Sequence, residues 1–163
     1  MKNAASGDKE RLQREVRGMK SLIVDDSHLI RQLIMNMLKP YSFTFTEAAN
    51  GVEAVARFKE AFDRGDPFDL VLMDIAMPEM DGQQALKEIR IIEKRAYKAS
   101  LSAEKYACII MVTGLEDPAS LMEAFSKGRC NGYLTKPIVL DELLEKLKRN
   151  HLLAPGTFPV RPG

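Results

Sequence analysis

The sequence has little of what marks secreted, membrane-spanning or nucleic-acid-binding proteins. Its 163 residues include two cysteines, Cys108 and Cys130, too few for a disulfide framework or a four-ligand zinc site. No apolar run approaches the ~20 residues that span a bilayer, and the N-terminus lacks the apolar core of a secretory signal. The formal net charge is +1, so the usual basic excess of nucleic-acid and membrane-surface proteins is missing. We therefore expect a cytoplasmic protein.

The composition is that of an ordinary globular domain. Apolar residues make up 45% and charged residues 29% of the chain, which excludes a wholly disordered protein. At this length a single domain is expected. We find no internal repeat, no low-complexity tract and no glycine-rich nucleotide loop of the P-loop type.

Five short apolar runs alternate with helical patterns along the chain. The runs are residues 21–24, 43–46, 70–73, 109–112 and 132–135. The first, third and fourth are almost continuously apolar, which is typical of strands covered by helices on both faces. Strict alternation favours a parallel sheet with helices on both sides. One of the few topologies left by right-handed crossovers is the α/β, flavodoxin-like (βα)5 three-layer sandwich with strand order 2-1-3-4-5.

Capping residues and apolar stripes mark the helices between these runs. Ser27 opens a helical pattern that Pro40 closes. Asn50 with Glu53 three residues on predicts the start of another helix. The step from Asp117 to Pro118 predicts a third start, and the last helix has an apolar face of Leu140, Leu143, Leu144 and Leu147.

Three segments fall outside this alternation, which places the domain at residues 19–153. Residues 1–18 mix charges of both signs, as in a mobile extension or a short extra helix. Residues 154–163 contain three prolines and are expected to form a mobile tail. Residues 93–106 make a long, charged link, which we interpret as a solvated surface insertion.

Polar side chains follow the predicted strands where each one ends. Asp25 and Asp26 follow the first strand, Asp74 the third, Thr113 the fourth and Lys136 the fifth. Each alone is commonplace, as a helix cap, a turn residue or a loop lysine. Because the carboxyl ends of parallel strands share one edge, we expect all five to converge. Crowded carboxylates call for a hard cation such as Mg²⁺, and a lysine and a hydroxyl beside it would suit a phosphoryl group.

Four segments carry a resemblance to a known family. They are LIVDDS (22–27), LVLMDIAMPEMDG (70–82), MVTG (111–114) and GYLTKP (132–137). Together they resemble the receiver domain of bacterial two-component response regulators, and the stretch from about residue 20 to residue 150 is similar to a stand-alone, CheY-like receiver. The resemblance implies a signalling protein that is phosphorylated on aspartate, and not an enzyme in the ordinary sense.

The resemblance also implies a role for each polar residue. Asp74 matches the phosphoacceptor, which takes a phosphoryl group from a histidine kinase or a small phosphodonor as an acyl phosphate. Asp26, Asp74 and the backbone carbonyl of Ala76 match the Mg²⁺ ligands, while Asp25 matches the acidic residue that orients a metal-bound water. Lys136 matches the lysine that contacts a phosphoryl oxygen.

Thr113 and Tyr133 match the pair that switches on phosphorylation. In the family the hydroxyl moves toward the phosphoryl group and the ring turns inward, which shifts a population between two packings. In the unphosphorylated state Tyr133 is equally interpreted as an edge aromatic with its hydroxyl in water. The implied output surface spans residues 118–148. Pro137 matches a cis Lys–Pro bond, and Pro78 and Gly82 match the turn after the phosphoacceptor.

Two positions bear on the lifetime of the signal and one on relay chemistry. Ala76 and Leu115 are apolar where the family flanks the path of an attacking water, so we expect slow self-dephosphorylation. His28, in the first turn of the first helix, is interpreted as a surface or site-rim residue and not as a relay histidine.

Two other classes remain as alternatives. A pseudo-receiver would keep the fold and act as an unphosphorylated protein-binding module, although such proteins usually lose an acidic residue or the lysine. A haloacid-dehalogenase-type phosphatase needs a second aspartate two residues after its nucleophile, and that position holds Ala76.

The expected partners are proteins. The resemblance implies a sensor histidine kinase or phosphotransfer protein upstream and a protein target downstream, with no direct DNA binding, no membrane contact, and a monomer or weak dimer. A chemotaxis regulator, a relay intermediate and a phosphate sink all fit, and the charged stretch from Arg95 to Lys105 is a candidate for partner selection.

Overall fold

Five parallel strands form one sheet in the order β2-β1-β3-β4-β5. The computed structural model describes residues 8–9, 12, 17–99, 105–114, 119, 122, 127 and 129–160. Within them the strands are β1 (Met19–Val24), β2 (Phe43–Ala48), β3 (Leu70–Asp74), β4 (Cys108–Thr113) and β5 (Gly132–Thr135). The predicted strand order is confirmed.

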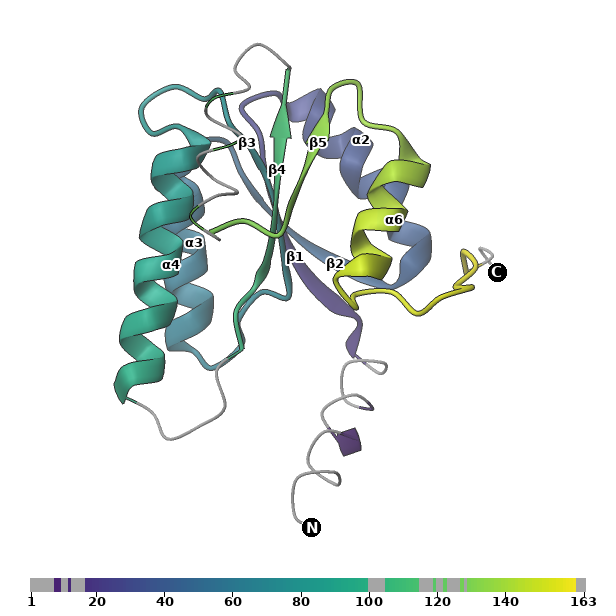
Figure 1. The fold of residues 1–163 in the computed structure, drawn as a ribbon, viewed down its shortest axis with the longest axis horizontal. Coiled ribbons are helices and arrows are strands. Elements are labelled where there is room, and N and C mark those ends of the chain that lie inside the picture. Colours follow the sequence, from purple (N-terminus) through teal and green to yellow (C-terminus); the bar gives the residue numbers. More distant parts are fainter. Residues whose placement is uncertain are drawn as a thin grey trace.

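Helices cover both faces of this sheet. They are α2 (His28–Leu38), α3 (Gly51–Asp63), α4 (Gly82–Ala99) and α6 (Leu140–Arg149), with a 3₁₀ turn η1 (Lys39–Tyr41) after α2. Figure 1 shows α3 and α4 together on one side of the sheet and α2 and α6 together on the other. The result is the expected flavodoxin-like three-layer sandwich. None of the helices in the described parts of the chain is long and apolar enough to cross a membrane.

The predicted caps start α2 and α3. Ser27 Oγ accepts a hydrogen bond from Ile30 N at 3.4 Å, at the start of α2. At the start of α3, Asn50 Oδ1 accepts from Glu53 N at 2.8 Å, and Glu53 Oε2 accepts from Ala49 N at 2.9 Å. The first bond satisfies a backbone donor that the start of a helix leaves unpaired, and the second ties Glu53 to the residue before the cap. The cap expected at Asp117–Pro118 lies outside the described residues.

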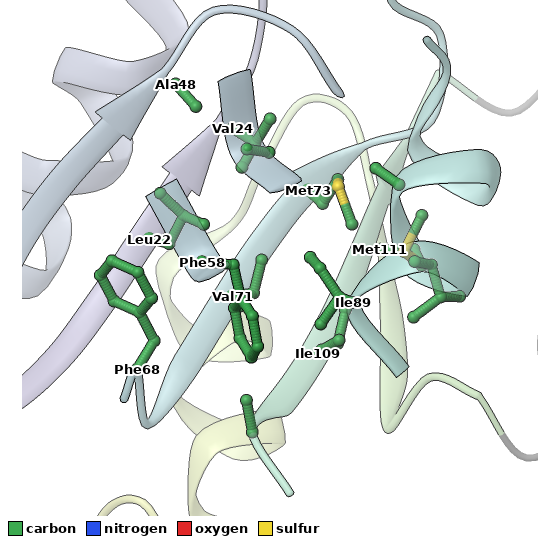
Figure 2. Close-up of a cluster of buried hydrophobic side chains, with 14 of the residues drawn as sticks. Leu22, Val24, Ala48, Phe58, Phe68, Val71, Met73, Ile89, Ile109 and Met111 are labelled. Carbon is green, nitrogen blue, oxygen red and sulfur yellow. The ribbon is translucent and has the colours of Figure 1, made fainter. Parts of the chain in front are cut away.

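The apolar core lies in two layers, one on each side of the sheet. Successive residues of a strand point to opposite faces, so alternate residues of β1, β3 and β4 belong to different layers. Figure 2 shows the layer beneath α3 and α4, whose fully buried members include Leu22, Phe58, Val71, Ile89 and Ile109. The layer beneath α2 and α6 includes Ile23, Ile34, Leu72, Ile110 and Leu143.

Helix α4 extends further than the sequence indicated. It continues to Ala99, so the first half of the presumed surface insertion is helical. Glu93, expected in solvent, has 0% of its surface exposed. Its carboxylate accepts from Ala107 N at 2.7 Å and pairs with Arg90 at 2.7 Å. The many charged residues of this stretch gave no sign that Glu93 is buried. Its partner Ala107 N, in the segment that leads into β4, is a backbone group, and such a partner cannot be recognised from residue types.

Arg90 joins α4 to the segments that enter β4 and β5. Its guanidinium donates to Ala107 O at 3.0 Å, to Arg129 O at 2.7 Å and to Asn131 Oδ1 at 3.0 Å. Asn131 in turn bridges the two strands: its Oδ1 accepts from Ile109 N at 2.8 Å, and its N donates to Ile109 O at 2.7 Å. The amino ends of β4 and β5 are thus held by one polar cluster, in which Arg90 and Glu93 are buried and Asn131 is exposed.

The last described residues return to the 3₁₀ turn. Val160 N donates to Pro40 O at 2.7 Å, while the Phe158 side chain is 84% exposed. The expectation of a mobile tail at 154–163 stays a prediction, as do the domain limits. Most of the N-terminal extension at 1–18 lies outside the described residues.

Candidate functional site

Three carboxylates converge at the carboxyl edge of the sheet. Asp25 and Asp26 directly follow β1, and Asp74 is the last residue of its neighbour β3. One carboxylate oxygen from each lies within 4.8 Å of the others. Asp25 is 1% and Asp74 4% exposed, while Asp26 faces solvent. The predicted convergence is therefore present, with two of the three carboxylates buried.

Lys136 reaches the same cluster from the end of β5. Its Nζ lies 2.9 Å from Asp25 Oδ2 and 3.2 Å from Asp74 Oδ2. The lysine backbone is fixed by a hydrogen bond from Lys136 N to Thr113 O at 2.8 Å. The Lys136–Pro137 peptide bond is cis, as the resemblance implied. One ammonium group is therefore shared between the two buried carboxylates.

The surroundings of Asp74 and Lys136 shift the pKa of both groups upward. Burial, together with the charge of Asp25, raises the pKa of Asp74, and Lys136 and a hydrogen bond from the Ala76 backbone only partly oppose this. Burial lowers the pKa of Lys136, but its ion pairs with Asp25 and Asp74 outweigh that effect and raise it. The two carboxylates thus favour the charged form of Lys136.

Arg31 is a site residue that the sequence did not single out. From α2 it donates to the backbone carbonyl of Asp25 at 2.7 Å and to Glu47 Oε1 on β2 at 2.9 Å. Asp25 Oδ1 also accepts from Ser27 N at 2.8 Å, so the acidic loop is fixed from both sides. His28 lies at the rim, as expected, with its ring 3.3 Å from the Arg31 guanidinium. An arginine one turn into the helix after the acidic pair was the available signal.

The turn after Asp74 allows no side chain at Gly82. A Cβ there would lie 2.1 Å from Asp74 O, and Gly82 N donates to Ile75 O at 2.9 Å. Gly51, the first residue of α3, is equally constrained, because its Cβ would lie 2.4 Å from Met80 O. The turn that carries Ala76 and Pro78 is therefore in close backbone contact with the first residues of α3 and α4, and glycine is required at both positions.

Thr113 and Tyr133 lie on the two strands beyond β3. Thr113 ends β4 beside the Asp74 edge and is 6% exposed. Tyr133, on β5, is 39% exposed, and Lys146 Nζ of α6 lies 5.3 Å from its ring centroid. The ring therefore faces outward in this structure. Leu115 and most of residues 118–128 lie outside the described residues.

The family model of the response regulator receiver domain matches residues 21–148. The chain belongs to this family. Receiver domains of this type operate in two-component signalling. The chemotaxis protein CheY of Listeria monocytogenes is 33% identical over 132 residues, which cover 80% of this chain and 97% of that protein. CheY of Bacillus subtilis is 36% identical over 129 residues, 78% of this chain and 93% of that one.

Comparison with a solved structure also relates the chain to CheY proteins. The receiver superposes with a TM-score of 0.68 on a chain from the CheX-CheY-BeF3-Mg+2 complex of Borrelia burgdorferi. The two are 26% identical, and the match covers 82% of this receiver and 89% of that chain.

The receiver's acidic cluster has the donors that a hard cation requires. Carboxylate and carbonyl oxygens are the ligands of Mg²⁺, which takes one or two carboxylates and keeps several waters. Among the described residues, nothing donates a well-directed hydrogen bond to the buried Asp25 Oδ2, although Lys136 lies in ion-pair range. Exposed Asp26 leaves the cluster open to water on one side. The residues present therefore fit a magnesium ion.

Proposed function

We propose that this receiver accepts a phosphoryl group on Asp74 in a Mg²⁺-dependent reaction. The observation that carries the proposal is a single buried carboxylate at the end of β3, paired with Lys136 at 3.2 Å and clustered with Asp25 and Asp26 within 4.8 Å. The donor is a phosphohistidine on a sensor histidine kinase or phosphotransfer protein, or a small phosphodonor. The protein acts in the cytoplasm as a signalling protein.

The reaction needs little covalent machinery from the receiver. An Asp74 oxygen attacks phosphorus, the bond from phosphorus to the histidine nitrogen breaks with its electrons going to nitrogen, and an aspartyl phosphate forms. Lys136 compensates negative charge on the transferring oxygens. Catalysis in this chemistry is mostly positioning and electrostatics, which two ion pairs and the fixed turn after Asp74 supply.

Asp25, Asp26, Asp74 and the Ala76 carbonyl would hold the magnesium ion. When bound, the ion neutralises charge on the phosphoryl group. Arg31 and Ser27 would help to orient these ligands, because they fix the loop of Asp25 through hydrogen bonds of 2.7 and 2.8 Å.

Phosphorylation would then bias the pair formed by Thr113 and Tyr133. A hydroxyl drawn toward the new phosphoryl group leaves a space that the half-exposed ring can fill. The surface altered is that of residues 118–148, and the partner that recognises it is a downstream protein. Slow loss of the phosphoryl group, expected from the apolar Ala76 and Leu115, stays a prediction.

Intact-mass measurement tests the phosphoacceptor directly. The wild-type chain is incubated with acetyl phosphate and Mg²⁺, beside an Asp74→Asn control. We expect one added phosphoryl group on the wild type only, and none after chelation of the metal. If neither acetyl phosphate nor a panel of histidine kinases modifies the protein, the pseudo-receiver alternative replaces this proposal.

A further inference from the structure

Helix α4 carries exposed cations that the acidic site does not use. Lys87, Lys94, Arg95 and Lys98 are all exposed. At 3.6 residues per turn their side chains fall within an arc of roughly 100°. Ile91 lies in the same arc and is 38% exposed. We call these five residues the basic stripe.

The cations of the basic stripe have no acidic partners among the residues that the structure describes. The neighbouring helix α3 differs in this respect. The exposed cations of α3 and its C-cap each pair with an acid one turn away: Arg57 with Glu53, Lys59 with Asp63, and the C-cap Arg64 with Glu60. Among the described residues of these two helices, unpaired positive charge is therefore concentrated on one face of α4, which the exposed Glu88 borders on one side.

The shape of the charged surface selects among anionic partners. The stripe runs from Lys87 to Lys98, roughly 16 Å at 1.5 Å per residue, and is one helix face wide. Helices α3 and α4 lie side by side on the same face of the sheet (Figure 1), and α3 exposes Glu60 and Asp63. Those carboxylates are paired with Lys59 and Arg64, so α3 offers no net positive charge beside the stripe. A membrane or a nucleic-acid duplex presents a broad negative surface, whereas an acidic helix matches a cationic surface that is one helix face wide.

We propose that the basic stripe docks an acidic helical segment of a partner protein. Glutamates repeated at helical spacing on the partner would face the four cations, and Ile91 would add an apolar contact within the charged row. Gly82, the first residue of α4, lies against Asp74. The stripe begins more than one helical turn further along α4, at Lys87, and extends away from the acidic site. Docking there leaves the phosphoacceptor open, so this surface is separate from the proposed function and is tested separately.

A pair of synthetic peptides tests the docking. One is a helical peptide with glutamates on a single face, and the other has the same composition with the glutamates distributed around the helix. We expect the one-faced peptide to bind the wild-type chain more tightly than the distributed one, with an affinity that falls as salt is added. Equal binding of the two peptides, or no binding of either at low salt, would overturn the proposal.

Matched charge reversals locate the site. Lys94→Glu with Lys98→Glu removes two cations of the stripe, and Lys59→Glu with Arg64→Glu makes the same change in net charge on α3. We expect the first variant to weaken binding of the one-faced peptide about tenfold, as expected for two exposed charge contacts, and the second to leave it within about twofold. Equal weakening by both would contradict a site on α4.

Three further measurements test the location of the site, the class of partner and the independence of the stripe from phosphorylation. Backbone amide shifts of the wild-type chain on addition of the one-faced peptide should cluster on residues 87–98, and shifts confined to α2 or α6 would overturn the proposal without any variant. Tighter binding to a DNA duplex or to phosphatidylserine vesicles than to the peptide, lost in the Lys94→Glu, Lys98→Glu variant, would assign the stripe to another class of partner. Acetyl phosphate should label that variant as it labels the wild type.

Discussion

At the scale of single residues, Arg31 is the clearest support of the acidic site. It donates to the Asp25 carbonyl at 2.7 Å and to Glu47 at 2.9 Å, so it links the loop to the edge strand β2. We expect Arg31→Ala to weaken Mg²⁺ binding, measured by titration calorimetry, about tenfold, as is usual when a residue that orients metal ligands is lost. Gln32→Ala is the matched neighbour and should bind Mg²⁺ normally. Unchanged Mg²⁺ affinity in a folded Arg31→Ala protein would show that the loop of Asp25 and Asp26 keeps its conformation without Arg31.

The buried pair of Arg90 and Glu93 makes a second prediction at this scale. Glu93→Ala removes both the partner of Arg90 and the acceptor of Ala107 N. An uncompensated buried charge should lower the free energy of unfolding by about 3 kcal/mol, measured by urea denaturation. Glu93→Gln keeps an acceptor for the amide, so we expect it to cost less. Equal, small losses for both variants would argue against the pair as a structural element.

At the scale of elements, the start of α3 should respond to pH. The hydrogen bond from Ala49 N lowers the pKa of Glu53; burial opposes this shift and Arg57 adds to it. A lowered pKa means that the stabilisation is present above the ordinary value of 4.5 and is lost as pH falls through the folded value. We expect Glu53→Gln to be less stable than the wild type near neutral pH, with the difference shrinking in acid. Urea denaturation from about pH 6 to pH 3 measures it, and a pH-independent difference would contradict it.

The elements themselves could largely be predicted from the sequence, and the exceptions have physical reasons. Strands β1, β3 and β4 are buried on both faces, so their apolar runs were visible, and Asn50 and Glu53 marked α3 through local hydrogen bonds. The end of α4 was missed because Arg90 and Glu93 occupy its buried face, where apolar residues are the usual signal. The convergence of Asp25, Asp74 and Lys136 followed from the sheet topology. The contact of Arg31 with Asp25 O did not, since it depends on how α2 packs.

At the scale of the whole molecule, the receiver should signal through Tyr133. The ring is 39% exposed and lies 5.3 Å from Lys146 Nζ. If Asp74 is phosphorylated as proposed, we expect the ring to become less accessible and to leave Lys146. Selective ¹³C labelling of tyrosine, with Tyr133→Phe to assign its signal, reports the change by NMR. Asp74→Asn should show no response to acetyl phosphate, and an unchanged Tyr133 signal in the phosphorylated wild type would exclude this ring as the switch.

The bridge between Ile109 and Asn131 also bears on the local stability of β4 and β5. Two hydrogen bonds of 2.8 and 2.7 Å join the amino ends of β4 and β5, and the Arg90 guanidinium donates to the same Asn131 side chain. Thr113 and Lys136 lie at the carboxyl ends of these strands. Thr113 and Lys136 are joined by one backbone hydrogen bond of 2.8 Å, whereas the amino ends are also tied to α4 through Arg90. Backbone amides near Arg90 should therefore exchange with deuterium at the rate of global unfolding, and those toward Thr113 should exchange through smaller openings.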